Sequence, residues 1–181
     1  MSRLKLLILD ACVVIQLHEM NYWQLILERC DVILSEIVAK LEVRFDNVNG
    51  VRIDLNPAIQ AGSIQVFAVE KKKIDSFRDQ FDAEYLELLD DGEAESLAFL
   101  FASCDEFMIS SADRIVYRVL GNLHRRDQGI SLEEILNRLG STASQLPRQY
   151  TKEFREQWSQ TGFKERMRGI GFRADSAGDR I

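Results

Sequence analysis

The sequence predicts an α/β fold in three layers, with helices on both faces of a mainly parallel sheet of four to five strands and a helical extension at the C-terminus. Short apolar runs alternate along the chain with longer segments whose apolar residues recur every three or four positions. The 181 residues are 46% hydrophobic and 29% charged, with only 2 Pro and 10 Gly, which excludes collagen-like and low-complexity chains.

The first strand is the most apolar run of the chain. In residues 4–10, Lys5 is the only polar residue before Asp10, a pattern typical of a parallel strand covered on both faces. This strand is therefore expected at the centre of the sheet. Three further strands are expected at residues 31–34, 63–69 and 106–110.

Helical spacing predicts the segments between the strands. The expected helices cover residues 12–29, 35 to about 45, a long stretch from Ile74 through Leu88, 94–103 and 112–123. In the second helix, Ser35 is the expected N-cap, and Ile37, Val38 and Leu41 form the expected buried stripe. Ser131 and Glu134 form a capping box, and a basic terminal helix is expected over 147–167.

These elements predict one domain with an extension. We expect the domain over residues 1–140 with an insertion at 46–62, a helical extension at 141–168 and a disordered tail at 169–181. Four aromatic residues recur on one face of the extension, and they indicate a packing surface. Docking on the domain itself, a homodimer and the binding of another protein all remain open. The four residues are Tyr150, Phe154, Trp158 and Phe163.

Charge is unevenly distributed along the chain. Residues 1–113 hold 21 acids and 10 bases, whereas 114–181 hold 8 acids and 13 bases, for a net charge of −6. The basic third either meets a polyanion or pairs with the acidic body. Three cysteines without a C-x-x-C spacing support neither a disulfide framework nor a zinc site. We therefore expect a cytoplasmic protein, and no run of about 18 apolar residues predicts a membrane span.

Three carboxylates follow three of the predicted strands. Asp10 ends the first strand, Glu93 lies in the first turn of a helix, and Asp113 follows the fourth strand. Because ligands bind at the carboxyl ends of parallel strands, we expect these side chains to converge. For one isolated acid, a favourable interaction with the dipole at a helix N-terminus is the preferred explanation, and Asp10 has a second one as a cap of the next helix. Glu95 lies about 200° from Glu93 around the helix, so we expect it exposed or paired elsewhere.

Gathered carboxylates raise one another's pKa unless a cation compensates their charge. Only oxygen ligands are available in this pattern, because the chain has two His and no paired Cys. Oxygen ligands favour Mg²⁺ or Mn²⁺ over Zn²⁺. Such a metal activates water and neutralises charge at a phosphodiester during hydrolysis. His18 and His124 are expected to be packing or surface residues.

Three motifs together resemble the PIN-domain family, the metal-dependent ribonucleases that include VapC-like toxins of bacterial toxin–antitoxin pairs. The first is an apolar strand that ends in Asp10, and the second is the helix start Gly92-Glu93-Ala94-Glu95. The third is Ser110-Ser111-Ala112-Asp113-Arg114. Order and spacing agree over roughly residues 4–140, and the glycine–glutamate motif is the most specific of the three.

The resemblance implies Asp10, Glu93 and Asp113 as the catalytic acids that hold Mg or Mn. Ser111 would occupy the Ser/Thr position beside the last acid, and Cys12 stands where the family commonly has Ser, Thr or Asn. The resemblance also implies RNA as substrate and an antitoxin protein as partner. Arg114 and Arg118 fall beside the expected site, where they bind backbone phosphate or pair with acids of the body.

One position departs from the family pattern. Lys40 stands where a further acid is usual. Glu36 lies one helical turn earlier on the same face, so either Glu36 is the catalytic substitute or the site lacks one acid and carries a lysine, which would reduce metal affinity and turnover. Glu42 lies about 200° from position 40 on an α-helix and is not expected to reach the site.

Two functions remain from different classes. The first is a metal-dependent endoribonuclease, and the alternative is a catalytically weak PIN-fold module that binds RNA or protein. A dehalogenase-type phosphatase is excluded because Cys12 replaces its second aspartate. Glycine-rich phosphate loops and a nucleophile-elbow motif are also absent from the sequence.

Overall fold

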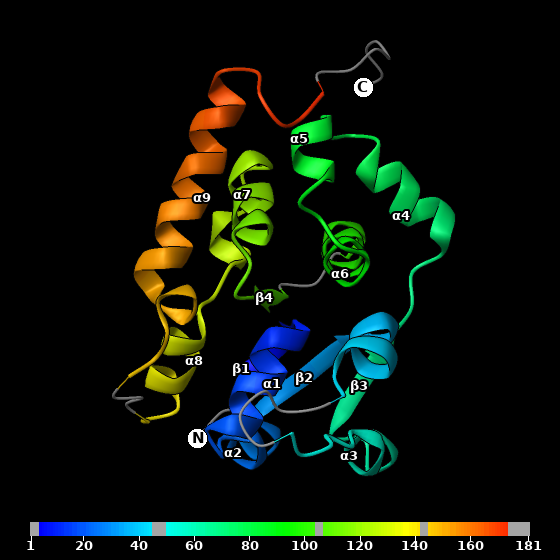
Figure 1. The fold of residues 1–181 in the computed structure, drawn as a ribbon, viewed down its shortest axis with the longest axis vertical. Coiled ribbons are helices and arrows are strands. Elements are labelled where there is room, and N and C mark those ends of the chain that lie inside the picture. Colours follow the sequence, from blue (N-terminus) through cyan, green and yellow to red (C-terminus); the bar gives the residue numbers. More distant parts are fainter. Residues whose placement is uncertain (1–3, 45–49, 104–106, 142–144, 174–181) are drawn as a thin grey trace.

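The computed structural model describes residues 4–44, 50–103, 107–141 and 145–173, and within these ranges four parallel strands form one sheet. The strands lie in the order β3-β2-β1-β4 (Figure 1). They are β1 (Leu4–Leu9), β2 (Cys30–Ser35), β3 (Ile64–Phe67) and β4 (Met108–Ser110). In register, Leu7 of β1 faces Val32 of β2 and Met108 of β4. The predicted α/β class and the interior place of the first strand are confirmed.

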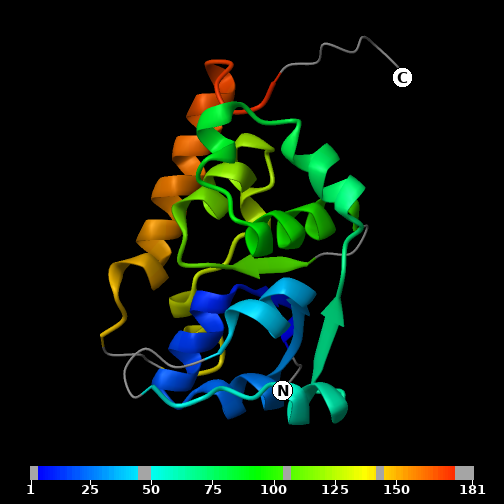
Figure 2. The ribbon, with the colours of Figure 1, turned by 45° about the vertical axis from the view of Figure 1, so that its right-hand side comes forward.

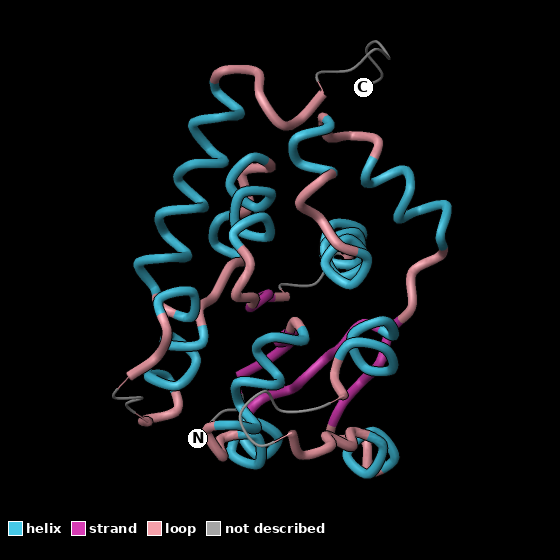
Figure 3. The backbone as a smooth tube through the Cα atoms, viewed as in Figure 1, coloured by secondary structure: helices cyan, strands magenta, loops and turns pink. Residues whose placement is uncertain are grey.

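Helices connect and cover these strands, as Figure 3 shows along the chain. None of those in the described ranges is long and apolar enough to cross a membrane. The α-helices are α1 (Ala11–Glu19), α2 (Trp23–Arg29), α3 (Asn56–Gln60), α4 (Lys71–Arg78), α5 (Ala83–Leu86), α6 (Asp91–Ala102), α7 (Arg114–Asn122), α8 (Leu132–Arg138) and α9 (Lys152–Met167). Shorter helical turns are η1 (Val38–Glu42), η2 (Arg126–Gln128) and η3 (Arg148–Tyr150).

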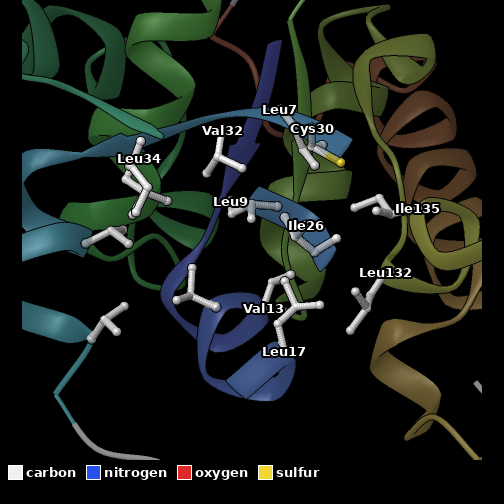
Figure 4. Packing of buried hydrophobic residues seen from close by; sticks show 14 of the residues in the cluster. Leu7, Leu9, Val13, Leu17, Ile26, Cys30, Val32, Leu34, Leu132 and Ile135 are labelled. Atoms are coloured by element: carbon white, nitrogen blue, oxygen red, sulfur yellow. The ribbon is translucent and has the colours of Figure 1, made fainter. Parts of the chain in front are cut away.

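Successive strand residues are buried in two different clusters. Leu7 and Leu9 of β1 pack with α1, α2 and α8 in the first cluster, which Figure 4 shows from close by. Ile8 and Ile109 belong to the second cluster, together with residues of α4, α6 and α7. Because side chains alternate along a strand, each strand contributes to both cores. Both faces of the inner strands β1 and β2 are therefore covered, whereas Gln65 and Val66 of the edge strand β3 are exposed.

Two expected helices are each divided in two. The helix expected over residues 12–29 is interrupted between α1 and α2, where Asn21 has a positive φ of 58°. The long helix expected from Ile74 through Leu88 ends as α4 and restarts as α5. Asp82 causes this restart, because its side chain accepts from Tyr85 N at 3.2 Å as an N-cap.

The C-terminal segment differs from the predicted disordered tail. Gly171 N donates to Asp82 Oδ2 at 2.7 Å, and Phe172 forms an antiparallel bridge with Phe81. Residues 169–173 are thus held against α5, whereas 174–181 lie outside the described residues. Within the predicted insertion, residues 46–49 also lie outside them, and the short helix α3 begins at Asn56.

The segment after β2 is a π-helical turn. Val43 N donates to Val38 O at 3.1 Å, five residues back, instead of four as in an α-helix. Leu41 is 57% exposed and does not belong to the buried stripe that an α-helix would give it. The prediction was wrong here because it assumed 100° per residue through this turn.

The C-terminal helix α9 packs along α7 (Figures 1 and 2). Two glycines allow a very close crossing. A Cβ on Gly162 would lie 1.9 Å from Arg118 O, and a Cβ on Gly121 would lie 2.0 Å from Ser159 O. Tyr150 is buried, and Phe154 and Trp158 pack against residues of the second core cluster. The extension thus docks on the chain's own domain, which is one of the three possibilities that the sequence left open.

Candidate active site

A pocket of about 610 Å³ opens where β1 and β4 end and the next helices begin. Five acidic residues line it, together with Cys12, Gln149 and Tyr150. The carboxyl ends of parallel strands lie at one sheet edge, which explains why residues so far apart in sequence meet here. The five acids are Asp10, Glu42, Asp90, Glu93 and Asp113. We call this the acidic pocket.

Asp10 is the buried centre of the acidic pocket. It is the N-cap of α1, and its Oδ1 accepts from Ala11 N at 2.8 Å. Its Oδ2 accepts from Ser111 Oγ at 2.6 Å and from Cys12 Sγ at 3.2 Å. Burial raises the pKa of Asp10, and the hydrogen bonds from Ser111 and Cys12 oppose this rise. Capping and membership of the acidic cluster are therefore both true of this residue.

Ser111 connects two of the acids. Besides donating to Asp10, its Oγ accepts from Asp113 N at 2.9 Å. The Ser111 carbonyl accepts a hydrogen bond from the buried Tyr117 OH at 2.8 Å, which holds the backbone at Ser111 in place. Cys12 completes the arrangement, since its Sγ accepts from Ala112 N at 3.1 Å. Both residues lie beside the acids, where the resemblance implies them.

Glu93 and Asp113 lie at the starts of two helices. Asp90 and Glu93 form a capping box: Glu93 N donates to Asp90 Oδ1 at 2.8 Å, and Asp90 N donates to Glu93 Oε2 at 3.1 Å. Asp113 caps α7, accepting from Ile115 N at 3.1 Å. Burial, followed by the charges of Asp10, Asp90 and Asp113, raises the pKa of Glu93 to about 9. The three expected acids thus line the same pocket.

Glu42, and not Glu36, adds the further acid. The π turn changes the direction of residue 42 relative to an α-helix, so Glu42 lines the acidic pocket. Burial, and then the charges of Asp90, Asp10 and Asp91, raise its pKa to about 7, which the Gly92 N–H partly offsets. A Cβ on Gly92 would lie 2.5 Å from Glu42 Oε1, so a glycine leaves room for this carboxylate.

Glu36 and Lys40 do not line the acidic pocket. They form an exposed ion pair at i,i+4, with side chains 45% and 65% exposed. Lys40 lines a different pocket on the other side of η1. Lys40 therefore does not occupy the place of a missing acid, and the expectation that Glu36 substitutes for it was wrong.

The two arginines expected to bind RNA lie differently. Arg118 is 5% exposed and pairs with Glu165 at 2.7 Å and Glu84 at 3.0 Å. It holds α7, α5 and α9 together and is not available to a phosphate. Arg114 is exposed beside Asp113, with its guanidinium 5.4 Å from the centre of the Trp158 ring. Of the pair, only Arg114 is placed to meet a ligand.

Glu95 is buried, contrary to the exposed alternative of our expectation. Its Oε1 accepts from Val69 N at 2.9 Å and its Oε2 from Ile37 N at 3.2 Å. The carboxylate therefore joins the segments after β2 and β3 to α6. This is a structural role away from the acidic pocket.

Residues missed by sequence reasoning come from three places. Glu42 was excluded by the assumed helix geometry. The capping-box spacing of Asp90 and Glu93 is visible in the sequence, but it carries no information about a pocket. Gln149 and Tyr150 come from the extension, and Tyr150 OH donates to Cys12 O at 3.1 Å. Only the aromatic stripe that includes Tyr150 could have indicated its contact with the domain.

The acidic pocket suits a hard cation in chemistry and charge. Its acidic side chains offer only oxygen ligands, and burial together with the neighbouring carboxylates raises the pKa of Glu42 and Glu93, which a cation would oppose. However, no three His, Cys, Asp or Glu side chains in the described ranges are already arranged to hold a metal ion. Oxygens of Asp10, Glu93 and Asp113 instead accept capping hydrogen bonds. A cation would have to compete with these bonds.

In metal-free buffer, the free energy of unfolding is expected to fall as pH rises from 4.5 to about 9. The folded-state pKa values of Glu42 and Glu93 are raised from 4.5 to about 7 and about 9, so the folded protein holds protons that the unfolded chain has released. The stability that these bound protons contribute is fully present at a pH below the pKa of the unfolded chain. It is lost as the pH rises through the pKa values of the folded protein. Denaturant titrations in EDTA across this range measure it.

The double variant Glu42→Gln, Glu93→Gln is the control for this pH dependence. It removes both titrating groups, so its stability should decline less over the same range. Added Mn²⁺ should stabilise the wild type more at high pH than at low pH, because ligands must be deprotonated. A wild type whose stability rises steadily through this range would contradict the raised pKa values.

Comparisons with known proteins give no relative from which a function could be inferred. No protein-family model, no curated protein and no solved structure matches it. The acidic pocket and the three motifs around it are therefore the basis for any functional assignment.

Proposed function

We propose that the protein is a PIN-like endoribonuclease that hydrolyses RNA phosphodiesters with Mg or Mn held in the acidic pocket. The finer architecture belongs to this proposal: a three-layer α/β/α PIN-like domain with a C-terminal helical extension. The resemblance also implies a toxin with an antitoxin partner. Such a partner would bind outside the aromatic face of α9, because that face packs on α7.

One observation carries the proposal. Asp10, Glu42, Glu93 and Asp113 come from four separate segments and line one pocket, with the pKa values of the first three raised. Asp10 and Glu93 are buried, and placing further carboxylates beside them is costly, because desolvation and mutual repulsion both oppose ionisation. A cationic ligand accounts for the arrangement.

The residues of the acidic pocket have different roles in the proposed reaction. Asp10, Glu93, Asp113 and Glu42 would hold the cation, which supplies an activated water and neutralises charge at the phosphodiester. Ser111 and Cys12 orient the Asp10 carboxylate through the two hydrogen bonds to Oδ2. Gly92 leaves the space in which the Glu42 carboxylate lies. Arg114, exposed next to Asp113, is placed to meet a substrate phosphate.

One observation favours the alternative of a catalytically weak binding module. No three potential ligand side chains in the described part of the chain are already arranged around a common metal position. Titration with Mn²⁺ separates the two functions. A nuclease binds Mn²⁺ and cleaves RNA only in its presence, whereas the module binds RNA equally well in EDTA and cleaves nothing.

Two glutamates provide a matched test of the site. Glu42→Gln is expected to lower Mn²⁺-dependent RNA cleavage by at least about tenfold, because it removes one anionic neighbour of the cation. Glu36→Gln, six residues earlier and on the outside of the turn, should leave the rate within about twofold, since a surface pair contributes little. Initial rates on a labelled RNA measure both. Equal effects of the two changes would contradict the placement of Glu42.

A further inference from the structure

A second pocket of about 500 Å³ lies on the other side of η1. The turn supplies Glu42 to the acidic pocket and Ala39 and Lys40 to this one, so it forms a wall of both. Residues from both ends of segment 45–49 meet here. The pocket is lined by Ala39, Lys40, Val43, Arg44, Arg52, Ile53, Asp54, Leu55 and Asn56, and we call it the basic pocket.

Positive charge is concentrated in the basic pocket. Residues 1–113 hold only 10 bases against 21 acids, yet Lys40, Arg44 and Arg52 all line this one pocket. Its acid is Asp54, whose Oδ1 accepts from Asn56 N at 3.0 Å and from Asn56 Nδ2 at 2.8 Å. Asp54 thus accepts hydrogen bonds at the start of α3, and among the described lining residues three basic side chains stand against this one acid.

The cationic groups are available to a ligand. Arg44 and Arg52 are exposed, and neither has an acidic partner within 4.0 Å among the residues that the structure describes. Lys40 pairs with Glu36, but both side chains are largely in solvent, where such a pair contributes about 0–1 kcal/mol. By contrast, Arg118 is committed to buried ion pairs.

The two arginines lie on ordered backbone. Ile53 N donates to Arg44 O at 2.8 Å, which joins the chain before and after segment 45–49. Val43, Ile53 and Leu55 are buried in the first core cluster and form the floor of the basic pocket. Because their neighbours are packed, the backbone that carries the two exposed arginines is held in place, and only their side chains must be ordered on binding.

We propose that Lys40, Arg44 and Arg52 bind backbone phosphates of single-stranded RNA and hold the chain beside the acidic pocket. The acidic pocket by itself repels a polyanion, so a substrate needs a cationic anchor close by. Guanidinium groups suit this role because they bind phosphate oxygens with two hydrogen bonds. Phosphate contacts of this kind position RNA without reading its sequence. The choice of RNA rests on the proposed nuclease function.

The test compares two double variants that lose the same charge. Arg44→Gln with Arg52→Gln is expected to weaken binding of a single-stranded RNA at least about tenfold. The slope of log K against log salt should fall by about 1.4, at about 0.7 for each phosphate contact on a single strand. Lys72→Gln with Lys73→Gln, on the exposed side of α4, should change the affinity less than about threefold. Fluorescence anisotropy in EDTA measures binding without cleavage.

A charge-preserving variant separates binding from folding. Arg44→Lys with Arg52→Lys keeps the charge but not the paired hydrogen bonds, so it should weaken binding less than the glutamine pair does, and thermal melts should show all variants folded. The basic pocket is not the binding site if Arg44→Gln with Arg52→Gln weakens RNA binding no more than Lys72→Gln with Lys73→Gln does. The same conclusion follows if neither double variant weakens binding. Binding of polyglutamate but not RNA would also overturn the proposal, by identifying an acidic protein ligand.

Failure of this proposal and failure of the nuclease proposal give different results. If Asp10→Asn abolishes cleavage but the arginine variant binds and cleaves RNA as the wild type does, only the basic pocket is wrong. If the arginine variant loses RNA binding while no variant of the acidic pocket affects cleavage, the RNA-binding role stands and the nuclease assignment fails.

Discussion

Asp10→Asn is expected to lower Mn²⁺-dependent RNA cleavage by at least about 10²-fold, the effect of removing one group that stabilises a transition state electrostatically. The change keeps the side-chain volume and removes the charge at the buried centre of the acidic pocket. Ser111 Oγ can still hydrogen-bond the amide, since a hydroxyl both donates and accepts. Initial rates on a labelled RNA, with and without Mn²⁺, measure the loss.

Stability distinguishes this loss from unfolding. Burial and Asp90 raise the pKa of Asp10, so a neutral amide relieves repulsion, and the metal-free variant should melt no lower than the wild type near neutral pH. Asp75→Asn on α4 is the matched control, since Asp75 is an exposed partner of Lys71. If Asp10→Asn cleaves RNA at the wild-type rate, the activity belongs to another site or to a contaminant.

Gly162→Ala is expected to destabilise the protein by about 3 kcal/mol, the upper part of the range for overpacking a close contact. The added Cβ would lie 1.9 Å from Arg118 O and 2.7 Å from Arg118 C, and backbone atoms cannot move aside as a flexible side chain can. At an open helix position, the same change would stabilise by up to about 1 kcal/mol. The sign of the effect therefore reports how closely α9 crosses α7.

Denaturant titration measures this change in the free energy of unfolding. Thermal melts should show a fall in Tm of about 6–12 °C for a chain of this size. Lys164→Ala, an exposed position on α9, is the control and should change stability by less than about 0.5 kcal/mol. Cleavage should also decline in Gly162→Ala, because Gln149 and Tyr150 precede α9 and line the acidic pocket. An increase in stability would show that the helices are not in contact at this glycine.

Local signals explain what could be predicted of the fold. Apolar runs, helix periodicity and caps depend on residues close together in sequence, so all four strands and the capping box of Ser131 and Glu134 are found as expected. Helix breaks were harder to predict. The restart at Asp82 is stabilised by a bond to Gly171, which is 89 residues away. No local pattern contains that contact.

The acidic pocket was partly predictable for the same reason. Asp10 and Asp113 follow strands directly and Glu93 starts a helix, and parallel strands bring such positions to one edge. Glu42 was not predictable, because a π turn is not marked by composition, and its wider turn directs the residue differently from an α-helix.

By itself, the sequence determined the class of fold, the order of its elements and three of the acids that share a pocket, because these depend on period and on the ends of strands. Only the tertiary structure decided which charges are used internally. Arg118 and Glu95 are committed to buried partners, whereas Arg44 and Arg52 are left to solvent. Charge alone does not reveal this, since a residue's partners are chosen by the packing of segments far apart in the chain.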